Sequence, residues 1–119
     1  MVFIAPMSSP IKYREILQRR LGFSDRVMRR FIARTERRLG FGWNQLEVPD
    51  MAAHVKTPPL LVVHDRNDRE TSWSEGAAIA EAWPDARLHT TERLGHYRIL
   101  RDPAVIDEVM RFLKDRQSP

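Results

Sequence analysis

The sequence contains no cysteine, so the chain can form neither a disulfide nor a thiolate metal site. Its four histidines, His54, His64, His89 and His96, are too widely spaced to suggest a local zinc motif, and we expect no metal and no other cofactor. No apolar run approaches the roughly 20 residues that span a bilayer, and residues 1–6 are too short and uncharged for a signal peptide. These absences predict a cytoplasmic protein.

The composition is that of an ordinary globular chain, with 42% hydrophobic and 30% charged residues among 119. This length is about that of one small domain. The positive charge is concentrated in one segment, because residues 12–38 hold ten Lys or Arg against three Asp or Glu, whereas the remainder holds ten against thirteen. Such a segment can contact nucleic acid, an anionic ligand or an acidic protein surface.

The beginning of the chain predicts a short strand and a helix. Residues 2–5 are apolar and end at Pro6, which is typical of a short buried strand. Ser9 followed by Pro10 is a common helix start, and Gly22 is a common helix end. We therefore expect a helix between these positions.

A second helix is predicted directly after the first. Ser24 can cap its beginning and Gly40 its end, and apolar residues recur between them at helical spacing. Residues 41–48 predict a loop, after which Asp50 can cap a short turn of helix.

The second half of the chain predicts alternating strands and helices. Residues 60–63 are consecutively apolar without alternation, which is typical of a strand buried on both faces of a parallel sheet. We then expect, in order, a loop over residues 65–71, a helix over 73–83, a strand over 87–91, a loop containing Gly95 and His96, and a helix beginning at Asp102 and Pro103. This βαβα order places functional groups in the loops that follow the strands.

Several segments of this second half resemble the last two βα units of α/β-hydrolases. They are PPLLVVHDRNDRE at 58–70, PDARL at 84–88, LGH at 94–96 and DP at 102–103, within about 60 residues in all. The resemblance implies an α/β fold, in which a short parallel sheet flanked by helices forms part of the hydrolase fold. It also implies that Asp68 is the acid and His96 the base of a catalytic triad.

The same resemblance divides the chain into two parts. Residues 1–56 would form a strand and a basic, helical, cap-like segment, and residues 57–119 the βαβα unit. In this interpretation the apolar faces of the cap helices contact the core, while their arginines face solvent or an acidic partner.

The chemistry of an acid and base pair supports this assignment independently. A histidine accepts a proton from a hydroxyl nucleophile only if its tautomer is fixed and its developing positive charge is stabilised, and a carboxylate bonded to Nδ1 does both. Adjacent parallel strands are about 4.8 Å apart, so loops leaving the same ends of two neighbours can bring Asp68 and His96 into contact.

Other titratable residues near the pair are alternatives. Asp65 is a rival acid, but it stands at a position where the resemblance implies glycine, so we expect it to be a turn residue at the end of the strand. Its carboxylate could also raise the pKa of Asp68 or reach His96 itself. We expect His64 to end its strand, and His54 and His89 to be surface residues.

The nucleophile of the family is missing from this sequence. It sits on a Gly-x-Ser-x-Gly turn, and no glycine pair flanks Ser8, Ser9, Ser24, Ser72, Ser74 or Ser118 in that way. An acid and a base without a nucleophile cannot transfer an acyl group, so we expect the chain alone to be inactive. It would be the C-terminal part of a hydrolase of esters or related acyl bonds in small molecules, a split gene product, or a degenerate descendant.

The alternative is a non-catalytic basic helical module that binds nucleic acid or an acidic protein partner. The two basic helices, joined at Gly22, superficially resemble a helix-turn-helix. However, the second helix lacks the Asn, Gln and Ser side chains that commonly contact bases, so nucleic acid is the less favoured partner.

Three strands cannot close the sheet that such a hydrolase builds. A strand edge that is left open invites pairing with another chain. We therefore expect either self-association or union with an N-terminal hydrolase portion, and no association with a membrane.

Overall fold

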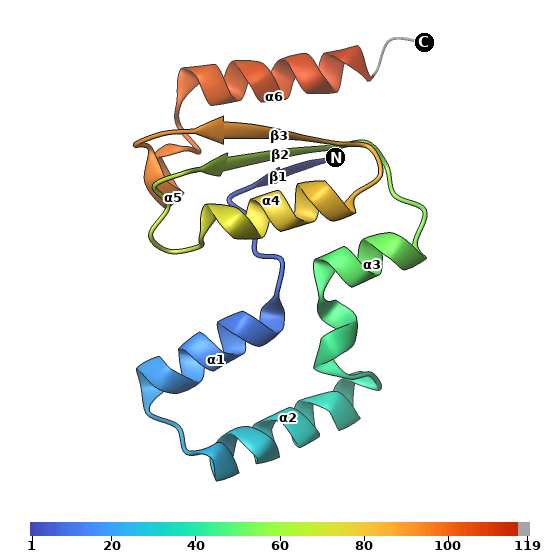
Figure 1. Ribbon diagram of the computed structural model, residues 1–119, viewed down its shortest axis with the longest axis vertical. Helices are drawn as coiled ribbons and strands as arrows, with labels where there is room; N and C mark the ends of the chain where they lie inside the picture. The colour runs from blue at the N-terminus through green and yellow to red at the C-terminus, as the bar shows by residue number, and fades with distance from the viewer. Residues whose placement is uncertain (117–119) are drawn as a thin grey trace.

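The computed structural model describes residues 1–116, which form a parallel sheet of three strands in the order β1-β2-β3. The strands are β1 (Val2–Ile4), β2 (Leu60–Asp65) and β3 (Ala86–Thr91). The helices are α1 (Pro10–Leu21), α2 (Asp25–Leu39), α3 (Val48–His54), α4 (Trp73–Ala82), α5 (Gly95–Arg98) and α6 (Pro103–Asp115), with a 3₁₀ turn η1 (Trp43–Leu46). Figure 1 shows α6 on one side of the sheet and α4 on the other.

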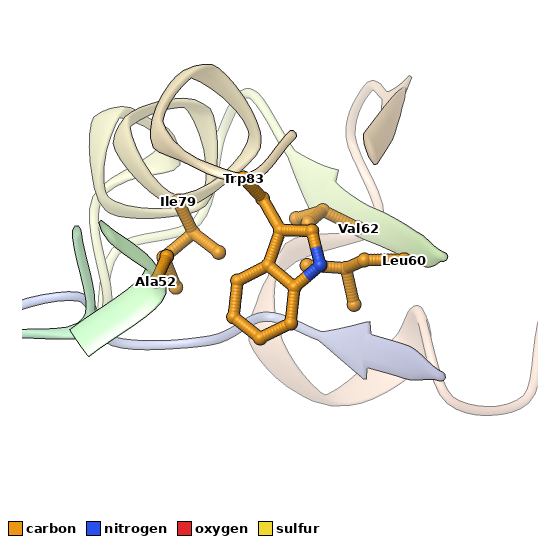
Figure 2. Packing of buried hydrophobic residues seen from close by; sticks show 5 residues of the cluster. All are labelled: Ala52, Leu60, Val62, Ile79 and Trp83. Atoms are coloured by element: carbon orange, nitrogen blue, oxygen red, sulfur yellow. The ribbon is translucent and has the colours of Figure 1, made fainter. Parts of the chain in front are cut away.

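The central strand β2 is buried along its whole length. Leu60 and Val62 pack with Ile79 and Trp83 of the α4 segment and Ala52 of α3, as Figure 2 shows. The intervening Leu61 and Val63 point to the other face, where they pack with Ile99, Val105 and Phe112. Each such side chain contributes about 1.5–3 kcal/mol on burial. The apolar run at 60–63 therefore forms a strand with hydrophobic cover on both faces, and the predicted α/β fold, a short parallel sheet flanked by helices, is confirmed.

The sheet register places the two functional loops together. Asp65, the last residue of β2, pairs with Thr91, the last residue of β3, in parallel orientation. The carboxyl ends of both strands therefore lie at the same end of the sheet, and the loops that follow them begin side by side. The α/β topology alone thus positions Asp68 close to His96.

Local capping explains α1 and α2, whose predicted bounds are confirmed. The Ser9 hydroxyl accepts a hydrogen bond from the Lys12 N–H, and Ser24 does the same for Val27. Gly22, with φ of 66°, terminates α1 in the left-handed region that other residues rarely adopt.

Three local predictions were wrong. Residues 43–46 form η1 instead of continuous loop, and α3 begins at Val48 with Glu47 as its cap residue. Asp50 lies inside the first turn of α3, because Pro49 is favoured at a helix start and moves the beginning upstream. Gly95 and His96 lie in the short helix α5, which is too brief for its periodicity to be visible in the sequence.

The expectation that the apolar faces of α1 and α2 contact the core was also wrong. Figure 1 shows both helices standing apart from the sheet, and Met28 is the one buried residue of the pair. Their apolar side chains, such as Val27 and Phe31, are 48% and 45% exposed. They line a wholly apolar hollow of about 410 Å³ between the two helices and Trp43.

The arginines of α2 are exposed, as predicted. No helix within residues 1–116 has both the length and the apolar character required to cross a membrane.

Candidate active site

The Asp68 side chain is fully buried in the loop after β2. Its Oδ1 accepts hydrogen bonds from the backbone N–H groups of Glu70, at 2.8 Å, and Thr71, at 2.9 Å. These bonds fold the loop around the carboxylate and leave Oδ2 facing His96, whose Nδ1 lies 2.8 Å away. The structure therefore brings the predicted acid and the predicted base into direct contact.

His96 reaches this position from the turn after β3. Gly95 has a φ of 68° and Arg93 a φ of 63°, so the chain passes twice through the left-handed region before α5. The imidazole packs edge-on against Tyr97, with ring centroids 5.2 Å apart. Its side chain remains 29% exposed, while Asp68 is covered completely. The pair thus consists of a buried carboxylate and an imidazole that solvent can reach.

Hydrogen bonding holds the pKa of Asp68 below its ordinary value. Burial alone would raise this pKa, but the N–H of Thr71, the ring of His96 and the N–H of Glu70 together stabilise the ionised form. The carboxylate therefore remains charged at neutral pH, as an acid that stabilises an imidazolium must.

Asp65 ends β2 at a turn, as expected, and is not the residue that contacts His96. Its carboxylate accepts hydrogen bonds from the Asn67 N–H at 2.9 Å, the Thr91 hydroxyl at 2.7 Å and the Leu94 N–H at 3.0 Å. It therefore ties the loop after β2 to the loop after β3. Asp68, and not Asp65, contacts His96, and the pKa of Asp68 is lowered.

The pKa of Asp65 itself is lowered. Burial works to raise it, but the Thr91 hydroxyl and the backbone N–H groups of Leu94, Gly95 and Asn67 outweigh that effect. An ionised Asp65 is thus part of the framework that holds both loops.

His64 is a neighbour of the pair that the sequence analysis missed as a site residue. It lies within β2, one residue short of the strand end, and is completely buried. Its Nε2 lies 3.3 Å from Oδ2 of Asp68 and 2.9 Å from the carbonyl oxygen of Thr71. In the sequence, the four-residue spacing from Asp68 gave no sign of this contact, because it depends on how the loop folds back over the strand.

The other two histidines lie away from the pair. His54 is exposed on α3, where its Nδ1 lies 2.7 Å from the Asp50 carbonyl oxygen, and His89 is partly buried in β3. Within residues 1–116, no group of three or more Asp, Glu or His is arranged to hold a metal ion.

Two open hollows adjoin His96. One, of about 520 Å³, lies over the loops and is lined by Asn67, Arg69, Arg93 and Tyr97 among others. The second, of about 230 Å³, lies between these loops and α1, which contributes Tyr13, Ile16 and Arg20. The first basic helix therefore borders the site, although its apolar face does not reach the sheet.

No nucleophile is paired with His96 in the part of the chain that the structure describes. Within residues 1–116, the His96 ring makes one hydrogen bond, and its partner is Asp68. Ser72 and Ser74 contact each other at the start of α4, with hydroxyl oxygens 2.9 Å apart. Ser118 lies outside the described residues.

Comparison with known families and structures agrees with this fold. The α/β-hydrolase family described as TAP-like protein matches residues 42–119, more than half of the chain. The structure of BpoC from Mycobacterium tuberculosis H37Rv matches 98% of this chain at 15% identity, with a TM-score of 0.62. An α/β-hydrolase enzyme, MGS-MChE2, from the metagenome of sediments of the lagoon of Mar Chica, Morocco, matches 98% at 17% identity, with a TM-score of 0.53.

The chain spans 58% of BpoC and 50% of MGS-MChE2. Among curated proteins, the ribosomal RNA large subunit methyltransferase H of Novosphingobium aromaticivorans is 34% identical over 82 residues, which are 61% of this chain and 58% of that protein. At these identities the two solved structures show the fold alone.

Proposed function

Because this chain belongs to the α/β-hydrolase family described as TAP-like protein, we propose that Asp68 and His96 are the acid and the base of a hydrolase catalytic triad. The contact of 2.8 Å between Oδ2 of Asp68 and Nδ1 of His96 carries this proposal. The nucleophile and the oxyanion hole belong to another portion of the hydrolase, and the bond that is cleaved is an ester or a related acyl bond.

The pair would act through the two nitrogens of His96. A carboxylate only accepts, so Nδ1 carries the proton that is shared with Asp68, and Nε2 is the nitrogen left to accept another. Nε2 takes the proton of a hydroxyl as its oxygen attacks the substrate carbonyl carbon, and then gives that proton to the leaving group. Water, deprotonated in the same way, attacks the acyl intermediate and releases the acid product.

The environment of Asp68 suits this task. An imidazolium formed during the reaction gains most from a carboxylate that is ionised, close and shielded from water. Asp68 has a fully buried side chain, two backbone N–H donors on its other oxygen and a lowered pKa.

The similarity to an rRNA methyltransferase gives weaker support for a different function. It covers 61% of this chain and 58% of that protein, whereas the hydrolase family matches residues 42–119 and is supported by the fold. Asp68 and His96 lie in contact, and the hydrolase proposal uses this contact directly for proton transfer.

The isolated chain should hydrolyse an activated aryl ester no faster than its His96→Ala variant. Esterase activity should appear when the chain is co-expressed with a hydrolase portion that carries the nucleophilic serine on a Gly-x-Ser-x-Gly turn. In that assembly His96→Ala should lower kcat by roughly three orders of magnitude or more. His54→Ala, which changes an exposed histidine on α3, is the matched control and should leave kcat unchanged.

Two outcomes would contradict the proposal. Saturable turnover by the isolated chain that His96→Ala abolishes would mean that the chain has its own nucleophile. An assembly that stays active without His96 would mean that the pair is not catalytic.

A further inference from the structure

His64 lies directly behind the proposed acid and base pair. It is completely buried, and its Nε2 is 2.9 Å from the Thr71 carbonyl oxygen and 3.3 Å from Oδ2 of Asp68. Oδ2 therefore faces two imidazole nitrogens, Nδ1 of His96 from the solvent side and Nε2 of His64 from the protein interior.

The contact with Thr71 determines which nitrogen of His64 carries the proton. A carbonyl oxygen only accepts hydrogen bonds, so Nε2 must be the protonated nitrogen of His64. The Nδ1 atom is buried and has no hydrogen-bond partner within the described residues. A proton there would be a buried donor without an acceptor, which favours the tautomer with its proton on Nε2.

The helix that covers His64 is shaped around it. Gly76 lies in the interior of α4, and a Cβ at this position would overlap Nδ1 of His64. Glycine is unfavourable inside a helix, so its presence here is explained by the room that the imidazole needs. Gly76 thus lowers the stability of α4, and Nδ1 of His64 stays without a hydrogen-bond partner within the described residues. Both unfavourable features accommodate the His64 ring.

We propose that His64 is a positioning residue that fixes the orientation of the Asp68 carboxylate toward His96. Its Nε2–H donates to the Thr71 carbonyl oxygen, and Nε2 lies 3.3 Å from Oδ2 of Asp68, so the polarised N–H attracts the carboxylate that the loop surrounds. Without this N–H, Oδ2 keeps only His96 as a neighbouring donor, and the orientation of the carboxylate depends on the two backbone bonds to Oδ1 alone. This inference rests on the proposed role of Asp68 and His96 and adds a third residue to it.

Two variants of His64 separate positioning from packing. In His64→Gln, the side-chain amide nitrogen reaches approximately the place of Nε2. In His64→Asn, it reaches only the place of Nδ1. Both variants remove the ring, and both carry the same amide group. Gln is longer by one methylene, so it alone returns a donor to the place of Nε2, and the packing of the two variants has to be compared separately.

The readout is the tautomer of His96 in the complete chain, observed in long-range ¹H–¹⁵N spectra of the imidazole nitrogens. Wild type and His64→Gln should both show His96 protonated on Nδ1. His64→Asn should lose this form in favour of the Nε2–H tautomer. Unchanged methyl resonances of Leu61 and Val63 would establish that both variants keep the core.

A second readout uses the hydrolase assembly described above. There His64→Asn should lower kcat with little change in KM, and His64→Gln should restore most of the loss. If the two variants show the same His96 tautomer as the wild type, or lose it to the same degree, the positioning role is wrong. That result is distinct from failure of the proposed function, which is judged by His96→Ala alone.

Discussion

The Glu75 carboxylate in the first turn of α4 lies 2.6 Å from the Ser8 hydroxyl, just before α1. The same oxygen accepts the N–H groups of Ser8, at 3.0 Å, and Ser9, at 3.2 Å. The other oxygen lies 3.0 Å from Nζ of Lys12. One buried side chain thus fastens the helical segment α1 and α2 to the layer that covers the sheet, close to the loop that contains Asp68.

Replacing Glu75 by alanine should release this segment. The variant leaves two buried backbone N–H donors and a hydroxyl without an acceptor, and each unsatisfied group costs about 1–3 kcal/mol. We expect the amides of Ser8 and Ser9 to exchange with deuterium much faster, while those of β2 change little. Glu81→Ala, which alters an exposed residue of the same helix, is the control. Equal protection of Ser8 in both variants would contradict this role of Glu75.

Replacing Asp65 by asparagine should loosen both loops of the site. Asparagine has one acceptor oxygen, but the carboxylate of Asp65 accepts from Asn67, Thr91 and Leu94, so the amide NH₂ must face at least one donor. We expect the free energy of unfolding to fall by about 1–3 kcal/mol, as measured by urea denaturation. Asp107→Asn, at an exposed position of α6, should change it little. A stability equal to that of the Asp107 variant would show that these bonds are dispensable.

The sequence predicted α1, α2 and the strands well because their signals are local. Ser9 and Gly22 bound a helix wherever the chain lies, and the apolar run of β2 needs cover on both faces in any fold. The contact between Asp68 and His96 followed from parallel topology. The role of His64 could not be predicted, because it depends on the path of a loop rather than on spacing.

The prediction that the apolar faces of α1 and α2 contact the core failed for a different reason. An apolar stripe shows that a helix face is suited to burial, but not what buries it. Met28 is the one residue of α1 and α2 that is buried, while Tyr13 and Val27 remain exposed around the hollow between the helices. The apolar stripes of α1 and α2 were therefore recognised correctly, but the prediction that they pack on the core was wrong.

Acid should destabilise the fold through three carboxylates. The pKa values of Asp65, Asp68 and Glu75 are lowered, since hydrogen bonds to the ionised forms outweigh the effect of burial. The unfolded chain has ordinary values of about 3.9 for Asp and 4.3 for Glu, so it binds protons before the folded chain does. The stability that these groups contribute is complete above those values and is lost as pH falls toward the lowered ones.

Urea denaturation between pH 7 and pH 3 measures this dependence. We expect little change from pH 7 to about 5 and a steep loss below about 4. The variant Asp65→Asn should be less stable at pH 7 but should show a shallower decline, because one of the three groups no longer titrates. A wild-type stability that is constant down to pH 3 would contradict the assignment.

Alanine at position 76 should destabilise the chain, although glycine to alanine inside a helix ordinarily gains about 0.5–1 kcal/mol. The added Cβ would overlap Nδ1 of His64, which is fully buried and cannot move aside freely. We expect a lower Tm in calorimetry. Combining Gly76→Ala with His64→Ala should relieve the overlap, so the two changes together should cost less than the sum of each alone. A raised Tm for Gly76→Ala would show that the ring can shift.

The outer edge of β1 should pair with a second polypeptide. The Ala5 N–H donates to the Val63 carbonyl oxygen and the Met1 carbonyl accepts from Leu61, both in β2. By alternation, Val2 and Ile4 direct their backbone groups to the open edge. Parallel sheets are ordinarily continued or covered at such an edge, and the chain spans only 50–58% of BpoC and MGS-MChE2.

Val2→Pro tests this pairing because proline removes an outward N–H and leaves the inward bonds of β1 in place. Val2→Ala is its matched control, since it also shortens the side chain but keeps the N–H. At micromolar concentration, light scattering should find the wild type and Val2→Ala associated, and Val2→Pro shifted toward monomer. A monodisperse wild-type monomer would exclude self-association through β1. The remaining test would then be co-purification with a hydrolase portion that carries the Gly-x-Ser-x-Gly turn, because that portion would pair with the same edge of β1.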